Sequence, residues 1–314
     1  MSMRFAVEPR DPAYGVPVEI EDLVATGAEV SVDLEEEPAA WAPRSPAADA
    51  TRPRSVLFCD GVRRVDATLW IDQGDGRVRP AMAASVGAGA VRCCGVTARV
   101  VARSVARCLA TASADAEEVP TRHGIYGLQR TAGDAPEVLN AAVVAAMAEL
   151  EVAVARAHGA DAELVLVDGR LRRPGGHPPG TVGYVKSHGA RYLPEDQEAV
   201  IPALEPGQRT PLFCIQQKMG AVVTWYLRLP GGRGHPWAGI VRCEVGGDLS
   251  ATRAARLADA CCLVLPSFAS SPHKDARAPV NLVPIGGLER DLRHHLGDQQ
   301  LLYRALLAAG TAAA

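Results

Sequence analysis

The stretch Ser55-Val56-Leu57-Phe58-Cys59-Asp60-Gly61 is an apolar run that ends in Asp-Gly, and Glu163-Leu164-Val165-Leu166-Val167-Asp168-Gly169 repeats this pattern. An apolar run of this length without polar alternation predicts a strand that is covered on both faces, as in the centre of an α/β sheet. If the two strands are parallel neighbours, Asp60 and Asp168 emerge at the same edge of the sheet. Two carboxylates at such close range repel one another unless a cation lies between them. Because hard divalent cations prefer oxygen ligands, the pair predicts a metal site.

The composition is that of an ordinary globular protein. The chain has 314 residues, of which 48% are hydrophobic and 22% charged, so it can bury a full core. We expect no membrane span, because even the apolar stretch 251–265 is interrupted by charges, and no signal peptide. The eight cysteines form no CxxC motif, which favours buried thiols in a reducing compartment. These features predict a cytoplasmic protein.

The charge is distributed unevenly. Residues 1–50 hold eleven acidic side chains against three Arg and carry −8, whereas the remaining residues carry +5. We therefore predict an acidic, Pro/Ala-rich N-terminal arm over 1–52, with a helical part around 18–25, and a folded domain over 53–314. The arm is expected to contribute to partner docking or dimer contacts. The alternative is a solvated leader that keeps a basic body soluble.

From residue 55 the pattern becomes regular. The strand at 55–60 is followed by alternation over 62–71, a hairpin signal at 72–76 and a long apolar strand over 78–91, which predicts an antiparallel meander of three strands. Residues 96–110 fit either a short helix or a strand. Later elements are predicted as a helix from Pro136 to 157, strands at 163–168, 181–187, 211–217, 221–229 and 238–245, and helices at 249–263 and 286–309.

This order predicts the fold class α/β, with an RNase H-like mixed sheet of three antiparallel strands, a helix, a parallel strand and flanking helices. Such folds place acids on the first strand, on the helix and on the strand that follows it. The helix offers Glu149 and Glu151, and Glu149 is preferred because it lies beside the apolar stripe at Met147 and Leu150. Three carboxylates at one sheet edge can hold two divalent ions that activate water and stabilise a leaving oxygen at a phosphodiester.

At this point the chain resembles the NurA nuclease family. The segments that carry the resemblance are 58–64, 166–171, 182–187, 225–229 and 280–288. The family's helix Glu lies about nineteen residues before the second Asp, as Glu149 does before Asp168. The chain departs from the family in its longer span between Asp60 and Glu149 and in its Pro-rich leader.

The resemblance implies the kind of activity and the partners. It implies a metal-dependent DNA nuclease with exonuclease action on DNA ends and endonuclease action on single strands, in DNA end processing or defence. Mn²⁺ is the implied cofactor, with Mg²⁺ as the substitute. The implied partners are DNA, a second copy of the chain in a homodimer, and a HerA-type hexameric ATPase.

Two further residues are candidates for the site. By the resemblance, His273 is a fourth metal ligand or proton shuttle. The alternatives are an exposed loop histidine, or Asp275 in its place. Lys186 is predicted to hold the scissile phosphate as a point charge, because its strand follows that of Asp168, although a surface lysine is the alternative. The predicted metal ligands are therefore Asp60, Glu149, Asp168 and His273.

Two other functions share part of this pattern. A phosphotransferase of the actin and sugar-kinase type has the same strand order, but it needs a phosphate-binding hairpin such as Asp-x-Gly-x-Thr after the first strand. The sequence Asp60-Gly61-Val62-Arg63-Arg64 does not supply one. A catalytically inactive scaffold that binds DNA or a partner is the other alternative, and the full set of three acids disfavours it.

Overall fold

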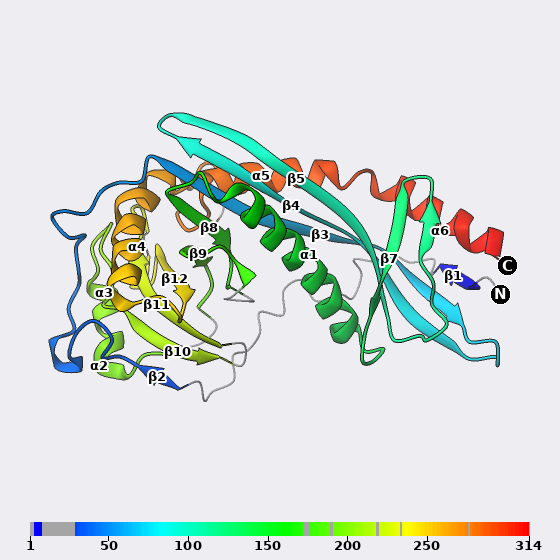
Figure 1. Cartoon of the computed structure of the whole chain (residues 1–314), viewed down its shortest axis with the longest axis horizontal. Coiled ribbons are helices and arrows are strands. Elements are labelled where there is room, and N and C mark those ends of the chain that lie inside the picture. The colour runs from blue at the N-terminus through cyan, green and yellow to red at the C-terminus, as the bar shows by residue number, and fades with distance from the viewer. Residues whose placement is uncertain are drawn as a thin grey trace.

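The computed structural model describes residues 3–7, 29–171, 176–188, 191–217, 220–232, 234–275 and 277–313. The fold is mixed α/β, and one large mixed sheet runs through it in the order β2-β10-β11-β12-β9-β8-β3-β4-β5-β7-β6, with β1 beside β3 (Figure 1). The strands are β1 (Phe5–Val7), β2 (Val30–Ser31), β3 (Ser55–Asp72), β4 (Val78–Cys94), β5 (Thr97–Thr111), β6 (Val119–Thr121), β7 (Gly124–Arg130), β8 (Leu164–Asp168), β9 (Thr181–Val185), β10 (Phe213–Gln217), β11 (Gly220–Arg228) and β12 (Ile240–Gly246).

The helices lie between and after these strands. They are α1 (Pro136–His158), α2 (Glu195–Glu198), α3 (Val200–Ala203), α4 (Ala251–Val264), α5 (Val283–His295) and α6 (Gln299–Ala313), with short 3₁₀ turns at Pro38–Ala40 and Leu265–Phe268. The predicted final helix over 286–309 is therefore two helices, which Gly297 separates with a φ of 85°. The predicted helix around 18–25 lies outside the described residues.

Three long antiparallel strands, β3, β4 and β5, form the central ribbon of the molecule. The predicted strands at 55–60 and 62–71 are one strand, β3, of 18 residues, because Gly61 remains extended within it. The third strand is β5, so the stretch 96–110 is a strand and not a helix. The observed sheet is also larger than the predicted three strands and their parallel neighbour, since β9 to β12 extend it beyond β8.

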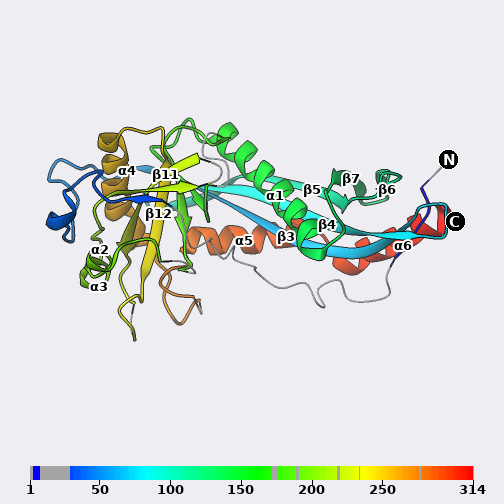
Figure 2. The ribbon, with the colours of Figure 1, turned by 90° about the horizontal axis from the view of Figure 1, so that it is seen from below.

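The order of elements places β8 parallel to β3. After β5 the chain forms β6, β7 and α1 and then returns through β8, whose residues Leu164 to Val167 pair with Val56 to Cys59. Helix α1 begins with Pro136 in its first turn, where proline is well tolerated, and ends at Gly159. Figure 2 shows α1 and α5 on opposite faces of the β3–β4–β5 ribbon.

The two faces of the sheet form separate cores. Phe58 and Leu166 point toward the face that α4 and α5 cover, where they pack with Leu288 and Leu292 of α5. Cys59 and Val167 point toward α1 and pack with its residues Val154 and Ala155. This alternation follows from the two-residue period of a strand, and it fixes the direction of every following side chain.

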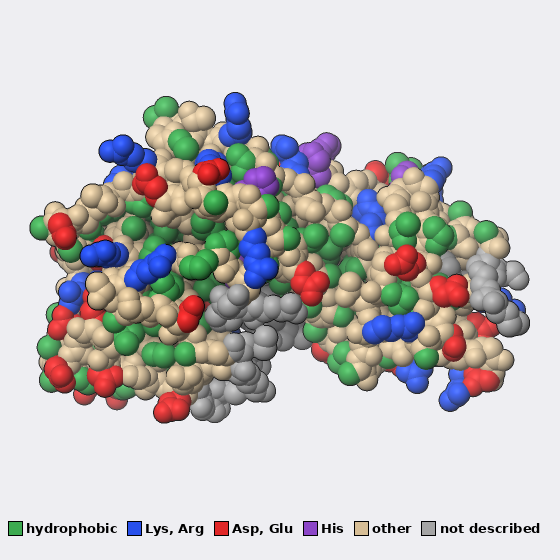
Figure 3. All heavy atoms as spheres, viewed as in Figure 1, with side chains coloured by type: hydrophobic (Ala, Val, Ile, Leu, Met, Phe, Trp, Pro, Cys, Tyr) green, Lys and Arg blue, Asp and Glu red, His purple; other side chains and the backbone are tan. Residues whose placement is uncertain are grey.

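Helix α1 is long and apolar enough to cross a membrane by length and composition, contrary to the prediction that no stretch of the chain is. A core helix passes the same test, and the inner face of α1 packs Leu139 and Val143 against β4 and β5. Only 28% of its most apolar window is buried. Its outer face is therefore largely open, and hydrophobic side chains are visible over this part of the molecule in Figure 3.

A buried polar network anchors the end of α5. Asp66 lies at an irregularity of β3 and accepts hydrogen bonds from Ser85, from the Tyr126 hydroxyl (3.0 Å) and from Arg64 Nε (3.0 Å). Arg64 in turn donates to the carbonyl of Gly297 at 2.8 Å. Arg107 binds Ser85 and donates to the carbonyl of Leu296. Two guanidinium groups thus satisfy carbonyls at the C-terminal end of α5, where positive charge is stabilising.

Part of the acidic N-terminal segment packs on the body. Residue Arg209 is buried and donates to both carboxylate oxygens of Glu35 at 2.8 Å and to Asp259 of α4 at 2.9 Å. Asp259 also accepts the backbone N–H of Ala47. Burial alone would raise the pKa of Glu35, but the hydrogen bonds and charge of Arg209 lower it overall. The segment around Glu35 is therefore packed on the body of the protein through Arg209 and Asp259. The division of the chain at residue 52 stays a prediction.

We predict that Glu35→Gln destabilises the protein by about 3 kcal/mol, because it leaves the buried Arg209 cation with one carboxylate in place of two. The free energy of unfolding from urea titration measures this effect. Glu36→Gln is the matched control: its carboxylate is partly exposed and pairs with Arg44 near the surface, so its loss costs less than about 1 kcal/mol. Equal stability of the two variants would contradict the packing role of Glu35.

Candidate active site

Asp60 and Asp168 lie at the same position of two neighbouring parallel strands. The last pair between β3 and β8 is Cys59 with Val167, and each carboxylate follows directly. Because Phe58 and Leu166 share the face of α5, both carboxylates also point to that face. Strand β8 ends at Asp168, whereas β3 continues to Asp72. The two acids therefore lie where β3 loses its parallel neighbour, as the Asp-Gly runs predict.

Lys186 lies just beyond β9, on the other side of β8. Its Nζ atom donates to Asp168 Oδ2 at 2.5 Å and to Asn281 Oδ1 at 3.5 Å. The Asn281 side-chain amide donates to Asp275. The structure thus brings Lys186 to the second acidic strand, as predicted, and connects Asp275 to the cluster through Asn281. The predicted role of Lys186 in holding a phosphate stays a prediction.

The helix acid nearest the two aspartates is Glu151, whereas Glu149 is exposed. Gly61 shows how close α1 comes, because a Cβ atom on it would lie 2.5 Å from Glu151 Oε1 and 2.8 Å from Met147 Cγ. Glu151 is one helical turn after Met147 and continues the buried stripe of α1. Glu149 is close to Met147 and Leu150 in sequence, which is why the sequence favours it. The helical phase nevertheless places Glu149 on the solvent-exposed side of α1.

The sequence reasoning missed two residues near the aspartates. Glu289 of α5 raises the pKa of both Asp60 and Asp168 by its charge. Arg277 lowers the pKa of Asp168 and lies 3.4 Å from Glu289. Both residues come from the C-terminal part of the chain, where the run 280–288 was noted only for its resemblance. The signal that could have identified them is their position, since Arg277 and Glu289 flank the run 280–288.

His273 is exposed within the turn that begins at Ser271. Among the described contacts of the carboxylates, none involves this histidine, whereas Asp275, two residues later, is connected to Lys186 through Asn281. The role of His273 as a metal ligand or proton shuttle stays a prediction. The geometry favours Asp275 as the member of this segment that faces the cluster.

Burial and mutual repulsion dominate the electrostatics of the site. Burial raises the pKa of Asp60 well above its usual range, and the charges of Asp168 and Glu151 raise it further. Burial also raises the pKa of Asp168, although the charge and hydrogen bond of Lys186 partly offset this effect. Among the described residues, Lys186 and the exposed Arg277 thus oppose the charges of four acids, Asp60, Asp168, Glu151 and Glu289, which leaves an excess of negative charge.

The donor set fits a hard divalent cation in its chemistry. Asp168 Oδ1 is buried and has no hydrogen-bond partner among the described residues. A buried carboxylate oxygen without a partner is costly, and a cation would satisfy it. In the described part of the chain, however, no three His, Cys, Asp or Glu side chains already converge on one ion position. Asp60 and Asp168 point to the face of α5, whereas Glu151 belongs to α1 on the other face, so the three would hold one cation only after their side chains are rearranged around the end of β8.

Comparisons with known proteins find similarity in structure alone. No protein-family model matches the chain, and no curated protein matches it by sequence. The NurA nuclease from Sulfolobus solfataricus is similar over 82% of this chain and 84% of its own, with 12% identity and a TM-score of 0.45. Endonuclease V from Bacillus subtilis has 13% identity and a TM-score of 0.34 over 77% of this chain and 81% of its own. Human ENDOV has 16% identity and a TM-score of 0.34 over 82% and 93%. These values are too low to decide function, which must be argued from the site itself.

We predict that Asp60→Asn stabilises the metal-free protein at pH 7, because burial and the neighbouring acids raise the pKa of Asp60 in the folded state. The folded protein binds the Asp60 proton more tightly than the unfolded chain does. The stability of the wild type therefore falls as the pH rises from about 4 through the raised folded-state pKa. The variant should show a smaller fall. Urea titrations in EDTA between pH 4 and pH 7 measure it.

Asp49→Asn is the control, since Asp49 is exposed. Added Mn²⁺ should raise the melting temperature of the wild type and of Asp49→Asn, and much less that of Asp60→Asn. A destabilised Asp60→Asn protein in EDTA would contradict the excess of buried negative charge.

Proposed function

We propose that this protein is a divalent-metal-dependent deoxyribonuclease with an RNase H-like core. The observation that carries the proposal is the pair of buried Asp60 and half-buried Asp168 at the end of β8, with Glu151 beside Gly61 and one carboxylate oxygen without a partner among the described residues. Folding brings these like charges together at the end of β8, and a divalent cation would stabilise them. Carboxylate sites that hold divalent cations are used for phosphoryl transfer. The sequence resemblance to NurA nucleases supports the same reaction class.

The side chains have distinct tasks in this proposal. Asp60, Asp168 and Glu151 would hold Mn²⁺ or Mg²⁺, and the chemistry supplied by the bound cation is activation of water and stabilisation of the leaving oxygen. Lys186 pairs with Asp168 in the structure and would be released by a competing cation. Its ammonium would then be available to a non-bridging phosphate oxygen. Arg277, which is exposed beside Glu289, is a second cation for the phosphodiester.

One observation disfavours the phosphotransferase alternative. In that class a phosphate-binding hairpin follows the first acidic residue, whereas here β3 continues without a turn for twelve residues beyond Asp60. The first hairpin of this ribbon, at 73–77, is therefore far along the strand from the carboxylates. A scaffold without activity remains as an outcome of the experiment below.

The proposal extends to substrate and partners on the strength of the sequence resemblance. We infer exonuclease action on DNA ends and endonuclease action on single strands, in a homodimer that docks on a HerA-like hexameric ATPase. Light scattering of the full chain gives the oligomeric state, and co-purification with such an ATPase tests the docking. A monomer at working concentration would remove the dimer from the proposal and leave the chemistry untouched.

We predict that the purified full chain cleaves labelled single-stranded DNA with Mn²⁺ and not with EDTA. Asp60→Asn, Asp168→Asn and Glu151→Gln each remove a metal-binding charge, so the cleavage rate should fall by at least about 100-fold. Glu149→Gln is the matched control on the same helix, and its rate should stay within about twofold of the wild type because the side chain is exposed.

Circular dichroism confirms that the variants are folded. If Glu149→Gln were inactive and Glu151→Gln fully active, Glu149 and not Glu151 would be the helix residue of the active site, contrary to the proposal. A wild type that binds DNA but never cleaves it, with any divalent ion, would instead identify a scaffold.

A further inference from the structure

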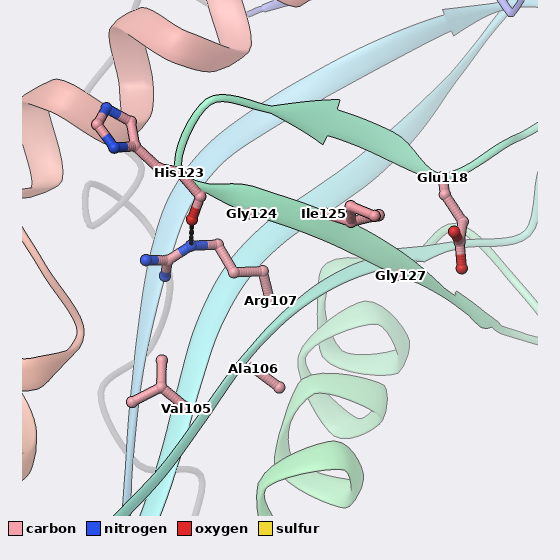
Figure 4. A pocket seen from close by; sticks show the side chains of 8 residues that line it. All are labelled: Val105, Ala106, Arg107, Glu118, His123, Gly124, Ile125 and Gly127. Atoms are coloured by element: carbon pink, nitrogen blue, oxygen red, sulfur yellow. Dashed lines mark hydrogen bonds between the residues drawn. The ribbon is translucent and has the colours of Figure 1, made fainter.

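Two cationic side chains of the molecule show the difference between a fixed and a movable charge. Arg107 is fixed, because it donates to the carbonyl of Leu296 and to that of His123, and the second of these bonds is drawn in Figure 4. Folding provides both acceptors, and neither belongs to the carboxylate site. Lys186 has a different environment, because its nearer acceptor is Asp168, the carboxylate that a divalent cation would use.

Lys186 would keep one described acceptor if a divalent cation occupied Asp168. Its Nζ atom lies 2.5 Å from Asp168 Oδ2 and 3.5 Å from Asn281 Oδ1, and the described hydrogen bonds include no other partner of this ammonium. The ammonium is repelled by a divalent ion on the same carboxylate. A shift of about 0.5 Å brings it to the usual hydrogen-bond distance from Asn281. The amide is therefore the nearest described group to which the displaced charge can move.

The two neighbours of the Asn281 amide fix its orientation. Its Nδ2 atom donates to Asp275, and its Oδ1 atom faces Lys186. A carboxylate only accepts hydrogen bonds and an ammonium only donates them, so an amide rotated by half a turn would be wrong for both neighbours. The side-chain oxygen of Asn281 thus remains directed at Lys186 whether or not Asp168 is occupied.

The backbone also keeps Asn281 in place. The residue is 2% exposed, its N–H donates to the carbonyl of Arg277 at 3.2 Å, and its carbonyl accepts from the N–H of Ser270 at 3.1 Å. The preceding carbonyl, that of Val280, accepts the hydroxyl of Tyr184 in β9 at 2.7 Å. An amide that is already held at these points loses little further freedom when it accepts another hydrogen bond.

We propose that Asn281 is a positioning residue that accepts the Lys186 ammonium when a divalent cation occupies Asp168. The inference rests on the proposed function and adds to it a way of loading the metal. Lys186 balances the acidic pair in the metal-free protein, and Asn281 lowers the free energy needed to move that charge aside. Because the amide is neutral, it holds the ammonium beside the site, where a phosphate oxygen can bind it.

The affinity for Mn²⁺ of the wild type, Asn281→Leu, Lys186→Met and the double variant tests the inference. The electron paramagnetic resonance signal of free Mn²⁺ measures this affinity without nucleic acid and without cleavage. Asn281→Leu removes the acceptor at similar side-chain volume, so it should weaken Mn²⁺ binding about fivefold, the effect of one hydrogen bond. In the Lys186→Met background no charge has to move, and the same substitution should change the affinity less than about twofold.

Two further variants separate this role from a structural one. Asn281→Ala removes the same oxygen without adding apolar surface, and it should reproduce the dependence on Lys186. Asn140→Leu is the matched control, since Asn140 is the other asparagine of the chain and lies in α1, and it should leave the Mn²⁺ affinity unchanged.

Equal weakening with and without Lys186, or no weakening in either Asn281 variant, would overturn the positioning role if circular dichroism shows folded proteins. A wild type that does not bind Mn²⁺ would overturn the proposed function and this inference with it. A protein that binds Mn²⁺ with the expected dependence on Lys186, and yet never cleaves nucleic acid, would support the role of Asn281 and count against nuclease activity alone.

Discussion

The parallel pairing of β3 with β8 is the constraint on which the site depends. It ends at Cys59 and Val167, one residue before two aspartates that share a face of the sheet. The apolar residues before them are buried on both faces, so the strands cannot slip without exposing that core. The repulsion between Asp60 and Asp168 is thereby sustained by hydrophobic burial elsewhere, and this is a common way for folds to maintain reactive groups at functional sites.

Helix α5 is the second support of the site. Its residues Leu288 and Leu292 lie so close to β4 that a Cβ atom on Gly89 would be about 3.0 Å from each, and 2.8 Å from the carbonyl oxygen of Ala102. Gly89 is also the cross-strand partner of Asp60. At the other end, Arg64 and Arg107 bind the last carbonyls of α5. The helix that carries Glu289 is thus fixed to the acidic strand along its length.

Much of the core could be predicted from the sequence, because it depends on local patterns. The two Asp-Gly runs, the helix from Pro136 and the parallel return strand follow from apolar periodicity, and the cluster of Asp60, Asp168 and Lys186 follows from that order. Local patterns do not resolve whether Glu149 or Glu151 faces the sheet, because a difference of two residues on a helix is decided by packing. Glu289, Arg277 and Asn281 depend on tertiary contacts across 95 residues or more, which no local pattern contains.

The same long-range contacts have a consequence for the newborn chain. The carboxylates Asp60, Glu151 and Asp168 and the nearby Lys186 are synthesised well before Arg277, and the covering helix α5 ends only at His295. At about 10 residues per second, the ribosome needs roughly 13 s to pass from Asp168 to His295. During most of that time Lys186 is present, but Arg277 and helix α5 are not. Biosynthesis therefore makes the acidic strands before Arg277 and α5, and the site can close only when the C-terminal part of the chain folds.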